Sequence, residues 1–258
     1  MSARRLVRIA PALGVLAALF VAWELVVRLA AVPEWLLPSP TVIVLEFAES
    51  LPQLAPHTAR TLLEAAIGYG AALLLAFVVA ALIDQSGLAR RALSPLLVTS
   101  QTIPIFALAP LLAIWFGFGI TPKILIVALA CFFPIAVSLA GGLRNADPDM
   151  QALVRSMGGS RRQVFSKVKL PAAIPSLLSG MKIAASYSVI AAVIGEWVGA
   201  SQGLGLYMLR ASSSFQTARV FAVIAVIAVL SVAMFLAVDV VGRRIAPWIY
   251  VRTEEAQT

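Results

Sequence analysis

The residue types that covalent or metal chemistry needs are sparse in this sequence. His57 is the single histidine and follows Pro56, and Cys131 is the single cysteine. Nucleophilic catalysis needs a nucleophile beside a base, and a zinc site needs several Cys, His or carboxylate ligands. Since neither pattern occurs, we predict no catalytic residue, no metal site and no enzymatic activity. We interpret His57 as a solvated residue of an outer segment and Cys131 as a small buried hydrophobe.

Phosphate-binding segments are also missing from the sequence. No G-x-x-x-x-G-K-[ST] segment occurs, and the glycines do not form a phosphate cradle at the start of a helix. The formal net charge is +8, but the basic residues are spread among apolar runs without interleaved aromatic residues. We therefore expect this chain to bind neither nucleotide cofactors nor nucleic acid.

The amino-acid composition indicates whether this chain folds in water or in a lipid bilayer. Of its 258 residues, 61% are hydrophobic and 12% are charged, and the mean hydropathy is +0.95. That leaves too little polar surface to cover a water-soluble globule, so the sequence predicts a protein of the lipid bilayer.

Apolar runs of about 20 residues are long enough to cross a bilayer as helices. The fold class expected is all-α, a polytopic membrane protein of about six transmembrane helices in a single domain, 1–258. Glu24 and Arg28 in the first run are four residues apart, as are Asp239 and Arg243 at the end of the last, and each pair is expected to be a local ion pair. The six runs lie at 9–31, 65–83, 95–116, 124–143, 176–200 and 220–238.

The basic residues predict how the chain is oriented. Fourteen of the twenty Lys and Arg residues lie in the N-terminal tail, the 84–91 loop, the 144–169 loop and the C-terminal tail. By the positive-inside rule these segments share the cytoplasmic side, which places both termini there. Segment 32–58 then lies outside, where a turn at Leu37-Pro38-Ser39-Pro40 precedes a short helix, 41–51. The first run is expected to stay as a helix rather than be cleaved as a signal peptide.

The fifth apolar run contains a carboxylate, and the third contains prolines that can interrupt a helix. Glu196 stands mid-span beside Trp197, where an ionised carboxylate costs about 2.5 to 3.5 kcal/mol. It is either a polar group in a translocation path or subunit seam, or a packing carboxylate satisfied internally. Pro104 and Pro110 remove backbone hydrogen bonds from the third run, and either kink it around a cavity or are absorbed by neighbouring helices.

The cytoplasmic loop 144–175, between the fourth and fifth runs, is too well punctuated to be a plain connector. Asp147 is placed to cap a first helix, Pro148 and Asp149 suit its first turn, and Gly158 is placed to end it in a left-handed conformation.

A second short helix is expected to follow. Ser160 with Gln163 has capping-box spacing, and the Leu170-Pro171 pair is expected to stop the helix.

The spacing within this loop is similar to a known signature. Nine residues follow Gly158 before Val168, and Lys169-Leu170-Pro171 come next. This resembles the G-x9-I-x-L-P half of the cytoplasmic signature of ABC importer permeases, whose first helix docks on an ATPase. In that family Glu-Ala-Ala begins six residues before the glycine, whereas this sequence has Ala152-Leu153-Val154 and lacks the glutamate.

The resemblance implies a type I ABC importer permease fold and a coupling role for the loop. Gln151, Arg155 and Ser156 remain as polar contacts around the turn that lacks the glutamate. The coupling residues implied are Asp149, Gln151, Ala152, Arg155, Ser156, Gly158, Gly159, Ser160, Arg161, Leu170 and Pro171.

Three stretches narrow the resemblance to permeases of the nitrate, sulfonate and taurine type. Gly195-Glu196-Trp197 is most similar to the branch for thiamine-related pyrimidine precursors and riboflavin. The stretches are Leu37-Pro38-Ser39-Pro40, then Pro110-Leu111-Leu112 with Trp115-Phe116-Gly117-Phe118-Gly119, and Gly195-Glu196-Trp197 with Gly203-Leu204-Gly205.

Such a permease works in the cytoplasmic membrane of a bacterium. The resemblance implies a second permease copy, a cytoplasmic ABC ATPase dimer that holds ATP and Mg, and an extracytoplasmic solute-binding protein. The substrate expected is a pyrimidine precursor or riboflavin, otherwise a sulfonate, nitrate or taurine. The alternative is an ion-coupled secondary transporter, for which an intramembrane carboxylate such as Glu196 is the supporting residue.

Overall fold

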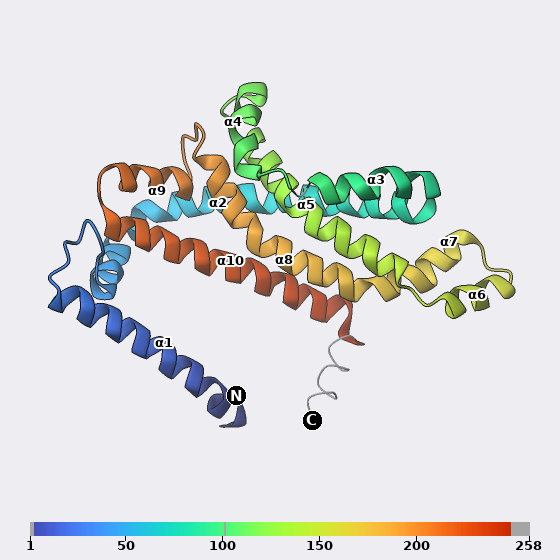
Figure 1. Ribbon diagram of the computed structural model, residues 1–258, viewed down its shortest axis with the longest axis horizontal. Helices are drawn as coiled ribbons and strands as arrows, with labels where there is room; N and C mark the ends of the chain where they lie inside the picture. The colour runs from blue at the N-terminus through green and yellow to red at the C-terminus, as the bar shows by residue number, and fades with distance from the viewer. Residues whose placement is uncertain (1–2, 101, 249–258) are drawn as a thin grey trace.

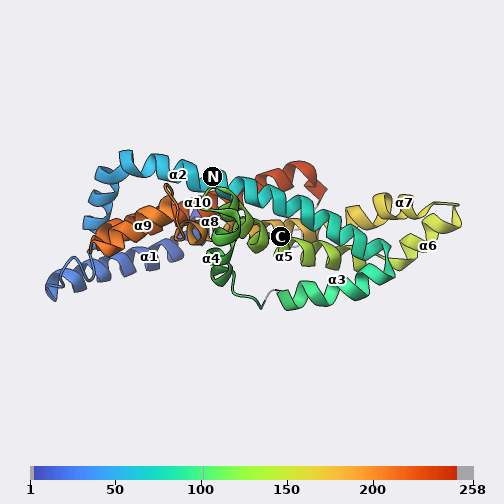
Figure 2. The same ribbon diagram turned by 90° about the horizontal axis from the view of Figure 1, so that it is seen from above.

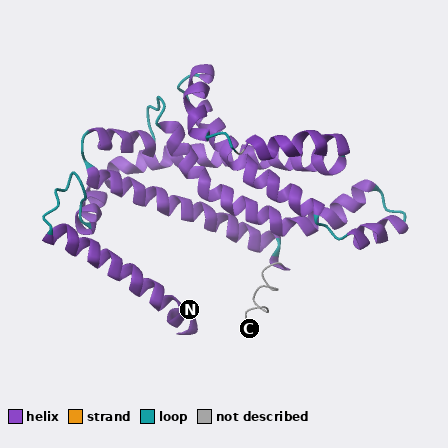
Figure 3. Ribbon diagram, viewed as in Figure 1, coloured by secondary structure: helices purple, strands orange, loops and turns teal. Residues whose placement is uncertain are grey.

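The protein is a bundle of helices without a strand among the residues that the structure describes, which confirms the all-α prediction (Figures 1 and 3). The computed structural model describes residues 3–100 and 102–248, with the backbone alone for 3–10, 12 and 13. The helices are α1 (Ala3–Leu29), α2 (Pro40–Gln85), α3 (Gly87–Ser100), α4 (Ile105–Phe116), α5 (Thr121–Arg144), α6 (Pro148–Ser156), α7 (Arg161–Val164), the π-helix η1 (Phe165–Lys169), α8 (Leu170–Glu196), α9 (Leu204–Ser213) and α10 (Thr217–Ile245).

Four stretches within the described residues are long and apolar enough to cross a membrane. They contain α2, α5, α8 and α10, and α3 with α4 adds a fifth if that bent pair counts as one span. The remaining expected span, 9–31, coincides largely with α1. Several membrane-spanning helices are therefore present, and the full count of six stays a prediction.

The third span differs from the expected single helix. It is broken into α3 and α4, whose axes meet at 102°. Pro104 is the N-cap of α4, and a residue before proline is disfavoured in helical geometry, so helix α3 ends before it. Pro95 and Pro110 lie inside α3 and α4 without ending them.

Helix α2 is longer than the sequence indicated. The helix expected at 41–51 is its first part, and the chain is helical from Pro40 onward. Ser39 is extended and Pro40 occupies the first turn, which agrees with the turn expected there. Figure 2 shows the first part of α2 running across the direction of the remainder, and Pro52 and Pro56 inside the helix account for that bend.

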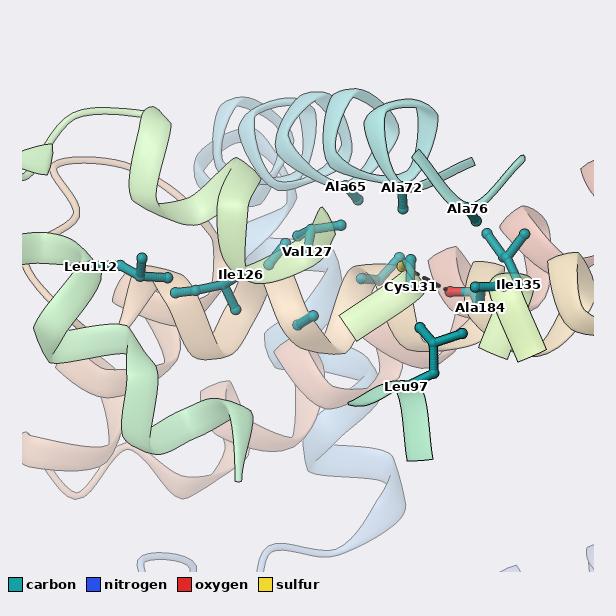
Figure 4. Packing of buried hydrophobic residues seen from close by; sticks show 14 of the residues in the cluster. Ala65, Ala72, Ala76, Leu97, Leu112, Ile126, Val127, Cys131, Ile135 and Ala184 are labelled. Carbon is teal, nitrogen blue, oxygen red and sulfur yellow. Dashed lines mark hydrogen bonds between the residues drawn. The ribbon is translucent and has the colours of Figure 1, made fainter. Parts of the chain in front are cut away.

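Small residues let the central helices approach closely. Ala65, Gly68, Ala72 and Ala76 form one buried stripe of α2. Figure 4 shows the three alanines against the neighbouring helices. A methyl group added to Gly68 would lie 2.5 Å from Cβ of Val127 on α5. Packing of this kind substitutes for the hydrophobic effect, which does not drive helices together inside lipid.

Helices α5 and α8 are packed in the same way. A Cβ on Gly180 of α8 would lie 2.6 Å from the carbonyl oxygen of Pro134, inside α5. Cys131 is fully buried at this contact and its thiol donates to the carbonyl oxygen of Ala184 at 3.3 Å (Figure 4). The interpretation of Cys131 as a buried hydrophobe is confirmed.

Helix α1 lies apart from the bundle along most of its length (Figure 1). It is attached near its C-terminal end, where the Glu24 carboxylate accepts hydrogen bonds from Arg28 and from both the hydroxyl and the backbone N–H of Thr41. The expected Glu24–Arg28 pair is present, and its carboxylate also accepts from the Thr41 N–H, one of the unpaired N–H groups at the start of α2.

Candidate functional site

The loop 144–175 of the sequence projects beyond one end of the bundle as α6 and α7 (Figures 1 and 2). Asp147 caps α6, with its carboxylate accepting from the backbone N–H of Asp149 at 2.8 Å. Ser160 caps α7, and its side chain and that of Gln163 form the expected capping box. Because these bonds satisfy the free N–H groups at both helix starts, each helix is fixed locally.

Two glycines make the turn between α6 and α7. Gly158 has φ of +81°, the left-handed conformation expected from its position. Gly159 donates to the carbonyl oxygen of Val154 at 2.9 Å, and a Cβ at Gly159 would lie 2.5 Å from that oxygen. The first glycine is required by backbone conformation, and the second by the close approach of α6.

Leu170-Pro171 does not stop the second helix, contrary to the sequence expectation. Residues 161–196 are helical throughout, from α7 through η1 into α8. Leu170 donates its N–H to the carbonyl oxygen of Phe165, five residues back, as in a π-turn. This wider turn lies directly before Pro171, which has no N–H to donate. The proline therefore falls in the first turn of α8, and the helix continues through it.

The surface of α6 is open. None of its residues is buried, and Met150, Leu153 and the C-cap residue Met157 are each more than half exposed. Gln151 and Ser156 are engaged within the loop, since they donate to the carbonyl oxygens of Ala146 and Leu153.

The other residues for which the family resemblance implies a coupling role lie around this surface. Arg155 is exposed and has no side-chain hydrogen bond or ion pair within the described part of the chain. Ala152, in the position of the family's glutamate, is exposed as well, and so are Asp149 and Arg161.

Ion pairs attach the loop end to the rest of the bundle. Lys169 of η1 binds the Asp84 carboxylate at the end of α2, with 2.7 Å between nitrogen and oxygen. Asp239 pairs with Arg243 at 2.8 Å, as expected, and also binds Lys182 of α8.

At the other end of the bundle, buried side chains hold the start of α9. Gly203 donates its N–H to Nδ1 of His57 at 2.9 Å, Leu204 donates to the hydroxyl of Thr61 at 2.9 Å, and Gly205 donates to the Glu196 carboxylate. Thr61 in turn donates to Glu196 at 2.6 Å. Three successive N–H groups at a helix start are thus satisfied by α2 and α8, and we call His57, Thr61 and Glu196 the α9 cap.

The α9 cap corrects two expectations. His57 is not a solvated loop residue but a half-buried residue of helix α2. Glu196 is not mid-span but the last residue of α8, and none of its side chain is exposed within the single chain. Of the two interpretations that the sequence left open, this geometry favours the internally satisfied carboxylate.

Charged groups around the α9 cap extend the buried polar region. Arg60 binds Glu64 at 2.8 Å, and Glu64 exposes only 1% of its side chain. Lys123 is 2% exposed, donates to the carbonyl oxygen of Phe118 at 2.8 Å and interacts electrostatically with Glu64 and Glu196. The sequence analysis missed this group, since Glu64 and Lys123 stand at the ends of separate apolar runs.

Other residues singled out in the sequence lie outside the α9 cap. Trp197 follows Glu196 directly and is 45% exposed. Pro104 and Pro110 both belong to the exposed side of α4. No hydrogen bond within the described residues joins these three side chains to the α9 cap.

The arrangement defines a class of protein. The apolar helices pack through small residues, the buried side chains of Glu64, Lys123 and Glu196 each bind a partner within the bundle, and a polar loop extends outside it. This chain is therefore a polytopic membrane protein with a helical loop that projects from one end of its bundle.

Comparison with known proteins identifies the family. Residues 72–247 match the family described as "Binding-protein-dependent transport system inner membrane component", and the chain belongs to that family. It is the permease subunit of an ABC importer, which is a transporter component.

Relatives agree with the narrower resemblance. The formylaminopyrimidine transport permease protein ThiX of Halalkalibacterium halodurans is 37% identical over 89% of this chain and 92% of that protein. The riboflavin transport system permease protein RibX of Chloroflexus aurantiacus is 32% identical, covering 92% and 91%. The taurine transport system permease protein TauC of Escherichia coli is also 32% identical, covering 92% and 88%.

A solved structure shares the fold. An inward-facing structure of the MetNI methionine ABC transporter aligns with a TM-score of 0.67 and 20% identity, covering 77% of this chain and 98% of that one. The type I importer permease fold expected from the sequence is confirmed.

Proposed function

We propose that this chain couples ATP hydrolysis in a separate cytoplasmic ATPase dimer to the passage of a small organic solute across the membrane. The carrying observation is the α6 surface, which has no buried residue and stands clear of the bundle. Met150, Leu153 and Met157 lie three and four residues apart on it, the spacing of one helix face. A helix that shows an apolar face to water, next to an arginine, suits a groove on a partner protein.

Arg155 is the polar anchor that we propose for this contact. The family glutamate is absent at Ala152, and Gln151 and Ser156 already use their side chains inside the loop. Arg155 is exposed and therefore available to a carboxylate of the ATPase.

The loop is suited to transmit movement. The run from Arg161 to Glu196 is one helical rod that connects the α6 turn to the α9 cap at the opposite end of the bundle. A displacement of α6 by a closing ATPase pair would reach the outer end of α8 as a rigid-body movement.

The remaining partners follow the family. We propose a single transmembrane domain, 1–258, that pairs with a second permease copy and receives solute from an extracytoplasmic binding protein. ATP and Mg would be bound by the ATPase, since this sequence has no phosphate-binding loop. Both termini, α6 and α7 would face the cytoplasm, in agreement with the distribution of Lys and Arg.

For the substrate we propose a thiamine-related pyrimidine precursor first and riboflavin second. The support is the 37% identity to the permease named for formylaminopyrimidine and the 32% identity to the one named for riboflavin. A sulfonate, nitrate or taurine is the remaining choice. Uptake of labelled compounds by cells that carry or lack this chain distinguishes them.

Co-purification tests the coupling proposal. The full chain, expressed with its neighbouring ATPase and extracted in mild detergent, is compared with Arg155→Glu and with Arg210→Glu, an exposed arginine of α9 at the opposite end. We expect the ATPase to be lost from the first variant and retained by the second. An ATPase absent from the unmodified complex, together with uptake that an ionophore abolishes at constant ATP, would favour the ion-coupled alternative.

A further inference from the structure

A basic hollow lies beside α3, at the end of the bundle that carries the projecting loop. Arg90, Arg91 and Arg144 line a space of about 580 Å³, together with Ser94 and Thr99. A smaller neighbouring space of about 220 Å³ shares Arg90, Ser94 and Arg144 and reaches between α3 and α5. Three guanidinium groups from two helices thus border one depression.

The positive charges of the three arginines in this hollow are not neutralised by carboxylates of the described chain. Asp84 is the one carboxylate among its lining residues, and it is already bound to Lys169 at 2.7 Å. Arg90 donates only to backbone carbonyl oxygens, at 3.4 Å, while Arg91 and Arg144 are exposed and make no side-chain hydrogen bond or ion pair with described residues. An anion of some kind is the complementary partner.

An apolar groove continues from the basic hollow. It has a volume of about 450 Å³ and meets the hollow at Thr99 and Leu97. Leu93, Leu96, Phe132 and Phe133 line it, and the two phenylalanines stand halfway along α5. The groove therefore runs from the arginines toward the middle of the membrane.

The length of the groove fits an acyl chain. From Arg91 to Ser100 α3 rises about 13 Å at 1.5 Å per residue, which is close to half of the roughly 30 Å hydrocarbon core. Figure 2 shows α3 along the outer edge of the bundle in this single chain. A free small anion would use the hollow and leave the groove unfilled.

We propose that this surface binds an anionic phospholipid, with its phosphate at Arg90, Arg91 and Arg144 and one acyl chain in the groove between α3 and α5. Basic pockets at membrane interfaces attract anionic headgroups, with about 1 kcal/mol for each Lys or Arg. The lipid would brace α3, which precedes the bend of the broken span, against α5.

Native mass spectrometry of the full chain in non-ionic detergent tests this site. The probes are phosphatidylglycerol and phosphatidylcholine with the same acyl chains, added at equal concentration. We expect phosphatidylglycerol to be retained preferentially, and Arg91→Gln with Arg144→Gln to lower its affinity roughly thirtyfold, the effect of two arginines. The matched control, Arg161→Gln with Arg162→Gln, removes two exposed charges from α7 and should keep the affinity.

A second variant tests the groove separately from the charge. Leu96→Trp fills the apolar groove without changing any charge and is expected to lower phosphatidylglycerol binding as well. Equal losses in the two arginine double variants would mean diffuse surface charge and overturn the proposal. Displacement of the lipid by millimolar inorganic phosphate would indicate a small-anion site and overturn the proposal. A dimer that retains the same amount of phosphatidylglycerol after the arginine substitutions would indicate that this surface is a protein interface, which also overturns it.

Discussion

Thr61 is the residue whose removal tests the α9 cap most directly. Its hydroxyl donates to Glu196 and accepts from the N–H of Leu204, and its side chain is fully buried. Thr61→Val keeps the volume and removes both bonds, which leaves a buried carboxylate and a buried N–H short of partners. We expect a loss of about 1 to 3 kcal/mol in stability, seen as a lower melting temperature of the purified chain.

The matched control is one helical turn away. Thr58→Val makes the same chemical change on α2, in a half-buried residue outside the α9 cap. It should leave the melting temperature nearly unchanged. Equal shifts in the two variants would mean that the cap adds nothing to stability.

Gly203 is constrained by both conformation and space. Its φ of +137° is unfavourable for other residues, and a Cβ there would overlap the Glu196 carboxyl group. Gly203→Ala should therefore destabilise the chain more than Gly119→Ala, which meets open space. Because the overlap involves one side chain, Glu196→Ala should offset part of the damage, and a double-mutant cycle of melting temperatures would measure that coupling.

At the scale of elements, substitutions of the two glycines in the α6–α7 turn should affect the coupling of ATP hydrolysis to transport to different degrees. Gly158→Ala places a methyl group in open space, so its cost is the left-handed backbone alone, about 1 to 2 kcal/mol. Gly159→Ala also forces α6 away from the turn, since the new Cβ would meet the Val154 carbonyl. We expect the second variant to lose more substrate-stimulated ATPase activity, with both inserted normally in the membrane.

The starts of α2 and α9 are stabilised by the same physical device. Glu24 of α1 binds the N–H of Thr41 at the start of α2, and Glu196 of α8 binds the N–H of Gly205 near the start of α9. In each case a carboxylate from a different helix meets N–H groups that a helix start leaves unpaired. Helix starts inside or beside lipid need such partners because water is scarce there.

For the whole molecule, orientation is the property that labelling can measure. Cys131 is fully buried, so the native chain gives a low background with a membrane-impermeant thiol reagent. Leu153→Cys on α6 should react in inverted membrane vesicles and stay unlabelled in intact cells with a permeable outer membrane. Ser201→Cys, at an exposed position in the loop before α9, should show the opposite pattern. A reversed pattern would contradict the positive-inside assignment.

The sequence by itself determined the features that depend on neighbouring residues. Hydropathy located the apolar helices, capping residues located the starts of α6 and α7, and the left-handed Gly158 was predicted from its position. These signals are local because a cap or a helix turn involves only a few successive residues. The family resemblance came from the same loop and from short motifs.

Only the tertiary structure decided what the buried polar residues do. His57 and Gly203 are 146 residues apart, and Thr61 and Glu196 are 135 apart, so no pattern of spacing links them. The sequence also did not predict that the helix continues through Pro171. The π-turn before this proline depends on the local backbone conformation, which the helix-breaking tendency of proline alone does not predict. Contacts between distant segments arise from how the helices pack, and packing is a property of the assembled bundle.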